Sequence, residues 1–473
     1  MLLALVLIPA VLSAVAYFVR RREWRSVCLL LGAGLHSGLT ASFWFAPAPR
    51  GPGGWLGVDP LGLLVLSTVS LLFLVVAVYA VGHLGVERPR GGRVFVSCLL
   101  GFLAAATVVT LSQHLALLWI GMETTTLALA PLVFHRHDRR SLEAVWKYLV
   151  LSSVGIALAL LGTFVLAAAQ TQGRPLVLED LLGSAGSLHP GLLRAAFVFL
   201  LVGYGTKMGL APLHSWKPDT YGEAPGLVAA LMAGGLTSCA FLGLARVTAV
   251  MTAAGQGDFI RPPLLALGLA SMLVGAGLML GQVDLKRLLA YSSVEHMGIL
   301  AIALGIGGVG SYGAALHVIN NGVAKVLLFL TVANLVLWFG SAETTRLRSV
   351  LRRAPISGSV LVLGLFAVTG SPPFGLFVSE FAILGAAVQQ DLVWVALAML
   401  LLLAVVFVGM AGAILAVVHR ETGAPGERVR ESPWLVGGTV FLTALALLLG
   451  LYLPMPLRAL LADAARVLGG SVP

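Results

Sequence analysis

Fourteen long apolar runs divide the chain, and they limit its fold more than any other feature. Each approaches or exceeds the roughly 20 residues that a helix needs to cross a bilayer. Hydrophobic residues make up 59% of the 473 residues and charged residues only 11%, whereas soluble domains carry about 25% charge. The sequence therefore predicts an all-α polytopic membrane protein with about 14 transmembrane helices and excludes a soluble or a disordered chain. The runs are approximately 1–19, 27–46, 59–82, 94–112, 115–134, 144–169, 192–213, 225–250, 263–282, 288–308, 311–338, 356–386, 392–418 and 433–453.

The basic residues lie mostly between these runs and on one side of them. Of the 30 lysines and arginines, 21 follow odd-numbered runs, Lys217 and Lys286 among them, and six lie on the other side. Because short cytoplasmic loops are rich in Lys and Arg, this asymmetry predicts that both termini lie outside the cell. The same spacing argues against nucleic acid as a partner. Of the three basic residues left inside runs, Arg246 is expected to extend from a helix end to the interface.

The sequence contains no recognisable cofactor-binding motif. Cys28, Cys98 and Cys239 are isolated in apolar runs and are too few to hold an iron–sulfur cluster. There is no P-loop and no glycine-rich nucleotide motif. The His and Asp residues at 135–138 lie among arginines that repel a cation, so we expect no metal there. The sequence predicts a polypeptide without a cofactor of its own.

Ionisable side chains inside the runs are the candidates for function, because a charge in mid-bilayer costs at least about 2.5–3.5 kcal/mol. Two of only five lysines lie there in an arginine-rich chain. A buried lysine can release its proton whereas an arginine cannot, which favours proton transfer. The predicted proton-translocation residues are Glu123, Lys207, His296, His317, Lys325 and Glu380, and further candidates are His214, Ser238, Glu295 and Asn321.

Several of these candidates also have a purely structural interpretation. Glu123 and Lys207 can form a static buried ion pair. His296 and His317 can serve as hydrogen-bond donors between helices. Glu295 can face the lipid headgroups, in which case it has no part in transport.

Two of the runs are interrupted by proline near functional candidates. Pro212 follows Lys207, and a double proline interrupts 370–375. Proline removes a backbone donor and breaks a helix, and non-helical backbone at membrane depth is tolerated only beside protein or water. Two interrupted helices at corresponding positions are typical of transporters that are built from repeats.

The C-terminal tail, 455–469, carries leucine, valine and alanine residues at helical spacing with its charges off that stripe. It is predicted either to lie along the interface as an amphipathic helix or to fray.

Four segments resemble the antiporter-like membrane subunits of respiratory complex I and its relatives. They are KMGLAPLHSWKPDTYGEAP at 207–225, DLKRLLAYSSVEHMG at 284–298, HVINNGVAKVLLF at 317–329 and GSPPFGLFVSEF at 370–381. WKYLVLSSVGIALALLGT at 146–163, together with SSVEHMG, looks most like component F of hydrogenase-4, a subunit of membrane-bound nickel–iron hydrogenases. The resemblance covers about residues 55–420.

The resemblance implies two inverted five-helix repeats that contain the broken helices 7 and 12. The corresponding domains are 1–93 for helices 1–3, 94–250 and 251–418 for the repeats, and 419–473 for helix 14 and the short amphipathic tail. It also implies a proton path in mid-membrane. On that path Glu123, Lys207, Lys325 and Glu380 are the ionisable groups of helices 5, 7, 11 and 12, joined by His296 and His317.

The chain departs from the resemblance at helix 8. Relatives usually carry a lysine or histidine there, whereas 226–245 offers only Thr237 and Ser238. Asn321 stands where a histidine is common, and Tyr221 replaces a histidine in the loop after helix 7. The proton path is therefore expected to cross helix 8 through water or to take another course.

The sequence predicts a proton-translocating subunit of a membrane-bound nickel–iron hydrogenase or a related redox-driven complex in a bacterial or archaeal inner membrane. The chain would be a non-redox subunit of an oxidoreductase complex, and nickel–iron and iron–sulfur centres would lie in partner subunits. Expected partners are other membrane subunits, the lipid bilayer and a cytoplasmic hydrogenase-like or complex I-like arm. Alternatives are a subunit of a multisubunit cation/proton antiporter, of complex I or of an inorganic-carbon uptake complex. In another functional class, the chain is a scaffold that transports nothing.

Overall fold

The computed structural model describes residues 1–45, 51–86, 92–170, 173, 175–419 and 427–471, and these are almost entirely helical. β structure within these ranges is limited to isolated bridges. The helices are α1 (Leu2–Phe18), α2 (Arg22–Ser42), α3 (Pro60–Val86), α4 (Gly92–Leu111), α5 (Leu115–Val133), α6 (Arg139–Ala169), α7 (Leu178–Gly183), α8 (Pro190–Met208), α9 (Trp216–Glu223), α10 (Gly226–Leu231), the π-helical turn η4 (Met232–Leu236), α11 (Thr237–Ala253), α12 (Gly257–Met279), α13 (Leu285–Ile306), α14 (Val309–Phe339), α15 (Val350–Arg353), α16 (Pro355–Val368), α17 (Gly375–Gln389), α18 (Val393–His419), α19 (Pro433–Leu451) and α20 (Met455–Val467). Short 3₁₀ turns lie at η1 (Pro52–Gly54), η2 (Phe134–Arg136) and η3 (Ala185–Ser187).

Among the described residues, eleven helical segments are long and apolar enough to cross a membrane, with α10, η4 and α11 forming one of them. The other predicted spans correspond to α1, which has 17 residues, to α2, which begins with charged residues, and to α16 and α17, which are the halves of one broken span. The predicted class, an all-α polytopic membrane protein, is confirmed.

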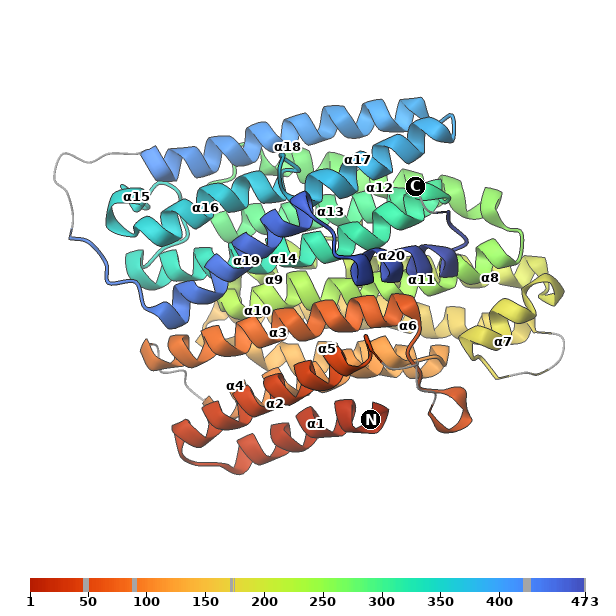
Figure 1. The fold of residues 1–473 in the computed structure, drawn as a ribbon, viewed down its shortest axis with the longest axis horizontal. Helices are drawn as coiled ribbons and strands as arrows, with labels where there is room; N and C mark the ends of the chain where they lie inside the picture. The colour runs from red at the N-terminus through yellow and green to blue at the C-terminus, as the bar shows by residue number, and fades with distance from the viewer. Residues whose placement is uncertain (46–50, 87–91, 171–172, 174, 420–426, 472–473) are drawn as a thin grey trace.

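The long helices lie side by side, and both chain ends are on the same half of the bundle (Figure 1). The connections between spans alternate between the two ends. A bridge joins His114 to Val177 at one end, and another joins Asp284 to Glu343 at the other. Chain ends on the same half of the bundle are what an even number of spans produces.

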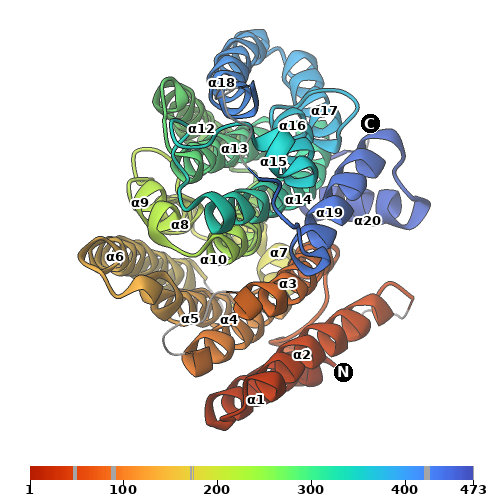
Figure 2. The same cartoon turned by 90° about the vertical axis from the view of Figure 1, so that its left-hand side faces the viewer.

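The centre of the bundle is formed by α10, α11, α13 and α14 (Figure 2). In the apolar 18-residue stretch of each span, all residues are buried in α10–α11 and 94% in α13, compared with 33% in α18 and in α19. Side chains on the central helices are therefore shielded from lipid by neighbouring helices, so polar groups can be held there at membrane depth.

Both predicted helix breaks are present, and each begins at a glycine. Gly209 adopts a positive φ of 75° after α8, and the Leu210 amide donates to the Gly205 carbonyl. Gly370 has a φ of 60° after α16, and the Ser371 amide donates to the Phe366 carbonyl in the same pattern. A left-handed glycine ends a helix in this way without a steric penalty. The helix that carries Lys207 therefore ends at Met208, before Pro212 can affect it.

The tail forms a helix, α20, that packs against α3 and α14. Leu460, Leu461, Ala464 and Ala465 are buried, whereas Arg458 and Arg466 are exposed. The predicted amphipathic pattern is therefore satisfied by protein contacts, and the alternative of a frayed end is wrong.

Two lysines that we counted as loop charges lie inside the protein. Lys217 is 0% and Lys286 4% exposed. The Lys286 ammonium donates to the carbonyl oxygens of Gly222 (2.5 Å) and Ala224 (2.7 Å), which close the C-terminal end of α9. Without these two lysines, the loops after odd-numbered runs still hold most of the basic residues. Neither lysine is evidence for the orientation of the chain in the membrane.

Arg246 does not extend to the interface, and this prediction was wrong. It is 0% exposed, and its guanidinium donates to the Asp59 carboxylate and to the carbonyl oxygens of Val109, Thr110 and Ser112. The C-terminal end of α4 and the start of α3 thus surround the guanidinium. A buried charge of this kind is tolerated because it is paired and hydrogen-bonded.

We expect Arg246→Met to lower the stability of the protein by about 3–5 kcal/mol, because it leaves the Asp59 charge without its partner. The measurement is the apparent melting temperature of the detergent-solubilised protein. Arg194→Met is the control, because Arg194 is exposed, donates a hydrogen bond to Gln256 and lies over the Phe259 ring, without a buried charge as its partner. Equal melting temperatures for the two variants would contradict a structural role for Arg246.

Candidate functional site

Glu123 of α5 and Lys207 of α8 meet beside α6. Lys207 is 0% exposed, and its Nζ lies 3.8 Å from Glu123 Oε2. The ammonium also donates to the Thr126 hydroxyl, and Ser153 donates to Glu123 Oε1 at 3.1 Å. Each member of the pair thus has a second, neutral partner, so the pair is looser than a bidentate salt bridge.

Close packing of α6 against α8 creates this position. A Cβ added at Gly203 would lie 2.6 Å from the Cβ of Ala159, and one added at Gly155 would lie 2.7 Å from Thr206. Small residues allow membrane helices to approach in this way. The approach brings Lys207 over the ring of Tyr148, 5.9 Å from its centroid, where the cation is attracted by the aromatic face.

A second group of ionisable residues lies between α13 and α14. Lys325 is 0% exposed, and its Nζ donates to the Ser292 hydroxyl at 2.5 Å. It also interacts electrostatically with Glu295 and Glu380. Glu295 is 0% exposed, so the alternative that this carboxyl faces the lipid headgroups is wrong.

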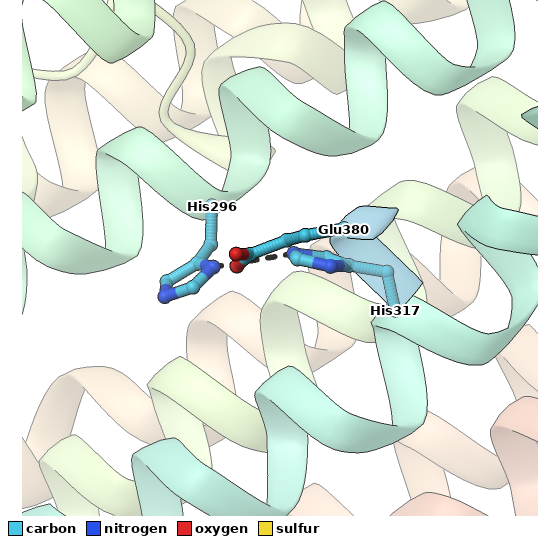
Figure 3. A group of neighbouring side chains, drawn as sticks. All are labelled: His296, His317 and Glu380. Carbon is cyan, nitrogen blue, oxygen red and sulfur yellow. Dashed lines mark hydrogen bonds between the residues drawn. The ribbon is translucent and has the colours of Figure 1, made fainter. Parts of the chain in front are cut away.

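His296, His317 and Glu380 converge from α13, α14 and α17 (Figure 3). His296 Nδ1 and His317 Nε2 are 3.2 Å apart, His296 Nε2 is 3.0 Å from the Val368 carbonyl oxygen, and His317 Nδ1 is 3.0 Å from the Ser379 hydroxyl. A carbonyl oxygen only accepts, so the neutral His296 carries its proton on Nε2. With both rings neutral, His317 Nε2–H donates to His296 Nδ1, and the Ser379 hydroxyl can donate either to His317 Nδ1 at 3.0 Å or to the Leu376 carbonyl oxygen at 2.9 Å. The result is a directional chain of hydrogen bonds that ends on the broken helix.

Within the described ranges, the same three side chains form the group that could hold a metal ion. Each offers one ligand atom, and these atoms lie within 4.8 Å of one another. Two imidazoles and a carboxylate suit several divalent transition metals. Both nitrogens of each ring already take part in a hydrogen bond, so a metal would have to displace one of these bonds at each histidine.

The cluster at 135–138 has another use for its carboxylate. The Asp138 side chain accepts from the Ser141 amide at 2.7 Å and caps α6. This hydrogen bond is the main cause that lowers the pKa of Asp138.

The remaining candidates lie in three different settings. Both polar atoms of the Asn321 amide are buried without a hydrogen-bond partner among the described residues. Ser238, at the start of α11, donates to the Gly234 carbonyl of the π-helical turn η4 at 2.6 Å, so the structure gives it a local partner. His214 is half-buried after the first break, and burial, followed by the charge of Lys217, lowers the pKa of its imidazole.

Buried polar atoms without a hydrogen-bond partner occur in both clusters and among the residues around them. Such atoms are costly in an apolar interior and are normally satisfied by bound water. We therefore expect water between the two clusters. In the described part of the chain these atoms include Glu123 Oε2, the hydroxyls of Tyr148 and Tyr221, both Glu295 oxygens, the Asn321 amide and Glu380 Oε1.

The sequence identified the charged members of the site but not their neutral partners. Thr126, Ser153 and Ser292 received no role, because a hydroxyl in a membrane helix usually bonds its own backbone. Lys217 was assigned to a loop. The aromatic residues Trp216 and Tyr221 on the same short segment were the available sign that it is buried.

Comparison with known proteins identifies the family of this chain. The family model for the NADH:quinone oxidoreductase/Mrp antiporter transmembrane region matches residues 112–407. A hydrogenase-4 component F homolog from Methylacidiphilum infernorum (isolate V4) is 33% identical over 355 residues, which cover 72% of this chain and 74% of the relative.

Solved structures share the fold over nearly the whole length. A chain of respiratory complex I from Thermus thermophilus with bound Aureothin is 26% identical, with a TM-score of 0.81 over 98% of this chain and 100% of that chain. A chain of the membrane-bound sulfane sulfur reductase, an archaeal respiratory membrane complex, has a TM-score of 0.90 over 99% and 97% at 20% identity. The resemblance inferred from the motifs is confirmed, and the chain belongs to the NADH:quinone oxidoreductase/Mrp antiporter family of membrane subunits.

Proposed function

We propose that this antiporter-like subunit moves protons through mid-membrane, from the Glu123–Lys207 pair to Glu380, within a membrane-bound hydrogenase or a related redox-driven complex. One observation carries the proposal. Ionisable side chains, all of them buried except the partly exposed Glu123, extend across the centre of the bundle from α5 to α17, and several of their polar atoms have no hydrogen-bond partner among the described residues. A stable membrane protein gains little from such groups, whereas a proton path requires them.

The first step uses the loose contact between Glu123 and Lys207. A carboxylate close to the ammonium favours the charged lysine, and separation of the two favours the neutral amine, because a buried charge is costly. Thr126 and Ser153 can hold the separated partners. Moving one charge across about 100 mV takes about 2.3 kcal/mol, which is less than the roughly 3–5 kcal/mol by which a buried charge is disfavoured when it loses its partner. The redox reaction of the complex has to supply the work that separates Glu123 from Lys207.

The second step uses the hydrogen-bonded histidines. Lys325 passes its proton toward His296, which is hydrogen-bonded to His317. When His296 takes up a proton on Nδ1, the His317 ring changes to its Nδ1–H tautomer and accepts from His296 at Nε2, so the direction of donation between the rings reverses. Transfer of that proton to His317 then brings it next to the Glu380 carboxyl. Glu380 then releases it at the broken helix α16–α17.

The setting of the subunit follows from its relatives and its charges. Because a hydrogenase-4 component F homolog is among the relatives, we place nickel–iron and iron–sulfur centres in partner subunits, and this chain acts as a non-redox subunit of that complex. The two similar breaks at Gly209 and Gly370 support a division into inverted repeats at 94–250 and 251–418. The basic end of the bundle faces the cytoplasm and both termini lie outside. A scaffold without transport is disfavoured, because it gives no reason for unpaired buried charges.

We expect Lys207→Arg to abolish proton transport, because arginine keeps the charge but does not release a proton near neutral pH. Glu123→Gln should act in the same way. The measurement is fluorescence quenching of a ΔpH probe in inverted vesicles, driven by the parent complex, with the redox rate recorded in parallel. Lys147→Arg, at an exposed position, is the control. Full transport in Lys207→Arg together with Glu123→Gln would overturn the proposed function.

Gly370→Ala should reduce transport at least tenfold without removing any ionisable group. An added Cβ would lie 1.9 Å from Glu380 Oε2 at a residue with positive φ, so the carboxyl must move. Gly385→Ala lies on α17 with no atom within 4 Å of its added Cβ and should have little effect. Vesicle assays of the two variants provide the comparison. Equal transport rates would show that the position of Glu380 does not matter.

Orientation can be measured by cysteine labelling in intact cells. Arg139→Cys, in an exposed position at the start of α6, should resist a membrane-impermeant maleimide. Ser187→Cys, exposed in the connection between α6 and α8, should react rapidly. The reverse pattern would place the basic end outside the cell.

A further inference from the structure

Lys217 is a buried lysine to which neither the family motifs nor the charge pattern gives a role. It lies on α9, directly after the first helix break, and is 0% exposed. The neighbouring Trp216 donates its indole N–H to the Thr206 carbonyl at 2.9 Å, which folds α9 back onto the end of α8. The Lys217 side chain runs over Gly209, where an added Cβ would lie 2.5 Å from Cδ and Cε and 3.1 Å from Nζ.

The ammonium of Lys217 has no anionic partner in the part of the chain that the structure describes. Its Nζ donates to the Ser293 hydroxyl at 3.1 Å and lies 5.9 Å from the centre of the Tyr221 ring. No carboxylate oxygen of the described residues is within 4.0 Å of it. Arg246 and Lys207, in contrast, each lie near a carboxylate, and Lys286 is held by two carbonyls. A buried lysine with one neutral hydroxyl as its partner is not stabilised in the charged form, so both protonation states are accessible to it.

Lys217 also joins the two clusters of the site. Its partner Ser293 is next to Ser292 on α13, and Ser292 is the partner of Lys325. The two ammonium groups interact electrostatically, and Lys217 also acts on His296. Two like charges in a low-dielectric interior disfavour each other, so a proton on one lysine promotes release from the other.

The span formed by α10, η4 and α11 supplies no alternative carrier. It contains no Asp, Glu, His or Lys, and its only basic side chain, Arg246, is fixed to Asp59. The aromatic side chains of Tyr148, Trp216 and Tyr221 pack between Lys207 and Lys217. The Tyr148 hydroxyl lies near Thr126 and the Tyr221 hydroxyl near Ser293, but neither makes a well-formed hydrogen bond within the described ranges, so both can bind water there.

We propose that Lys217 carries the proton between Lys207 and Lys325, a role that rests on the proposed function. The Lys207 ammonium gives one proton, through water held by the tyrosine hydroxyls, to the neutral amine of Lys217, and Lys207 becomes a neutral amine. The Lys217 ammonium then passes that proton past Ser293 and Ser292 to the neutral amine of Lys325. No other reactant takes part.

The test compares side chains that can and cannot exchange a proton at this position, in the assembled complex. Lys217→Met and Lys217→Arg should each lower proton transport at least tenfold with the redox rate retained. Lys217→His should restore part of the transport near pH 6.5, because the ordinary pKa of histidine is about 6.5. A structural lysine would not make His a better replacement than Arg, so equal transport in His and Arg variants would overturn the proposal.

Two further variants keep the test decisive. Lys286→Arg is the matched control, a second buried lysine that caps carbonyls beside an open cavity, and it should retain transport. If Lys217 variants fail to assemble, Ser293→Ala removes only the hydroxyl partner and should slow transport about fivefold, as expected for one hydrogen bond. Unchanged transport in Ser293→Ala would then count against the proposal. Full transport in Lys217→Met, with transport lost in Lys207→Arg, would overturn this inference and leave the proposed function standing, whereas full transport in both would overturn the function itself.

Discussion

The free-energy cost of holding ionisable side chains away from water is the constraint on which this structure depends. Arg246 meets it with a permanent partner in Asp59 and three carbonyls, and Lys286 meets it with two carbonyls. Lys207 and Lys217 are bound more loosely, by a distant carboxylate and by a single hydroxyl. The partners of Arg246 and Lys286 keep these side chains charged and stabilise the fold. The looser contacts of Lys207 and Lys217 leave their charge able to change, which is the property that proton transfer needs.

The broken helices connect backbone structure to this chemistry. At the second break the buried Val368 carbonyl accepts from His296 and so determines which nitrogen of that ring is protonated. Gly370, two residues later, leaves room for the Glu380 carboxyl. At the first break Gly209 leaves room for the Lys217 side chain in the same way. A continuous helix would have neither the free carbonyl nor the space, so the breaks position both ends of the ionisable row.

Helix packing provides the low-dielectric environment around these ionisable groups. The central helices α11, α13 and α14 are surrounded by others, so lipid does not reach their side chains. Hydroxyls from serine and threonine occupy the short gaps between charged groups, and their ability both to donate and to accept lets a proton pass in either direction. The π-helical turn at Met232–Leu236 packs against α14 beside Lys325, with the Cβ position of Gly234 2.7 Å from Val326. Irregular turns of this kind are frequent at functional sites.

The sequence by itself determined the membrane class, the approximate spans, both interrupted helices and the charged members of the site, because each of these is a local property. Apolar length decides whether a helix can cross a bilayer, and a charge in such a helix is recognisable without knowing its neighbours. The exact helix end at Met208, the buried pairing of Arg246 and the burial of Lys217 and Lys286 were decided only by the tertiary structure. Each of these depends on which distant segment lies against the residue. Lys217 has the sequence context of a loop, and it is buried because α9 folds back between α6 and α13.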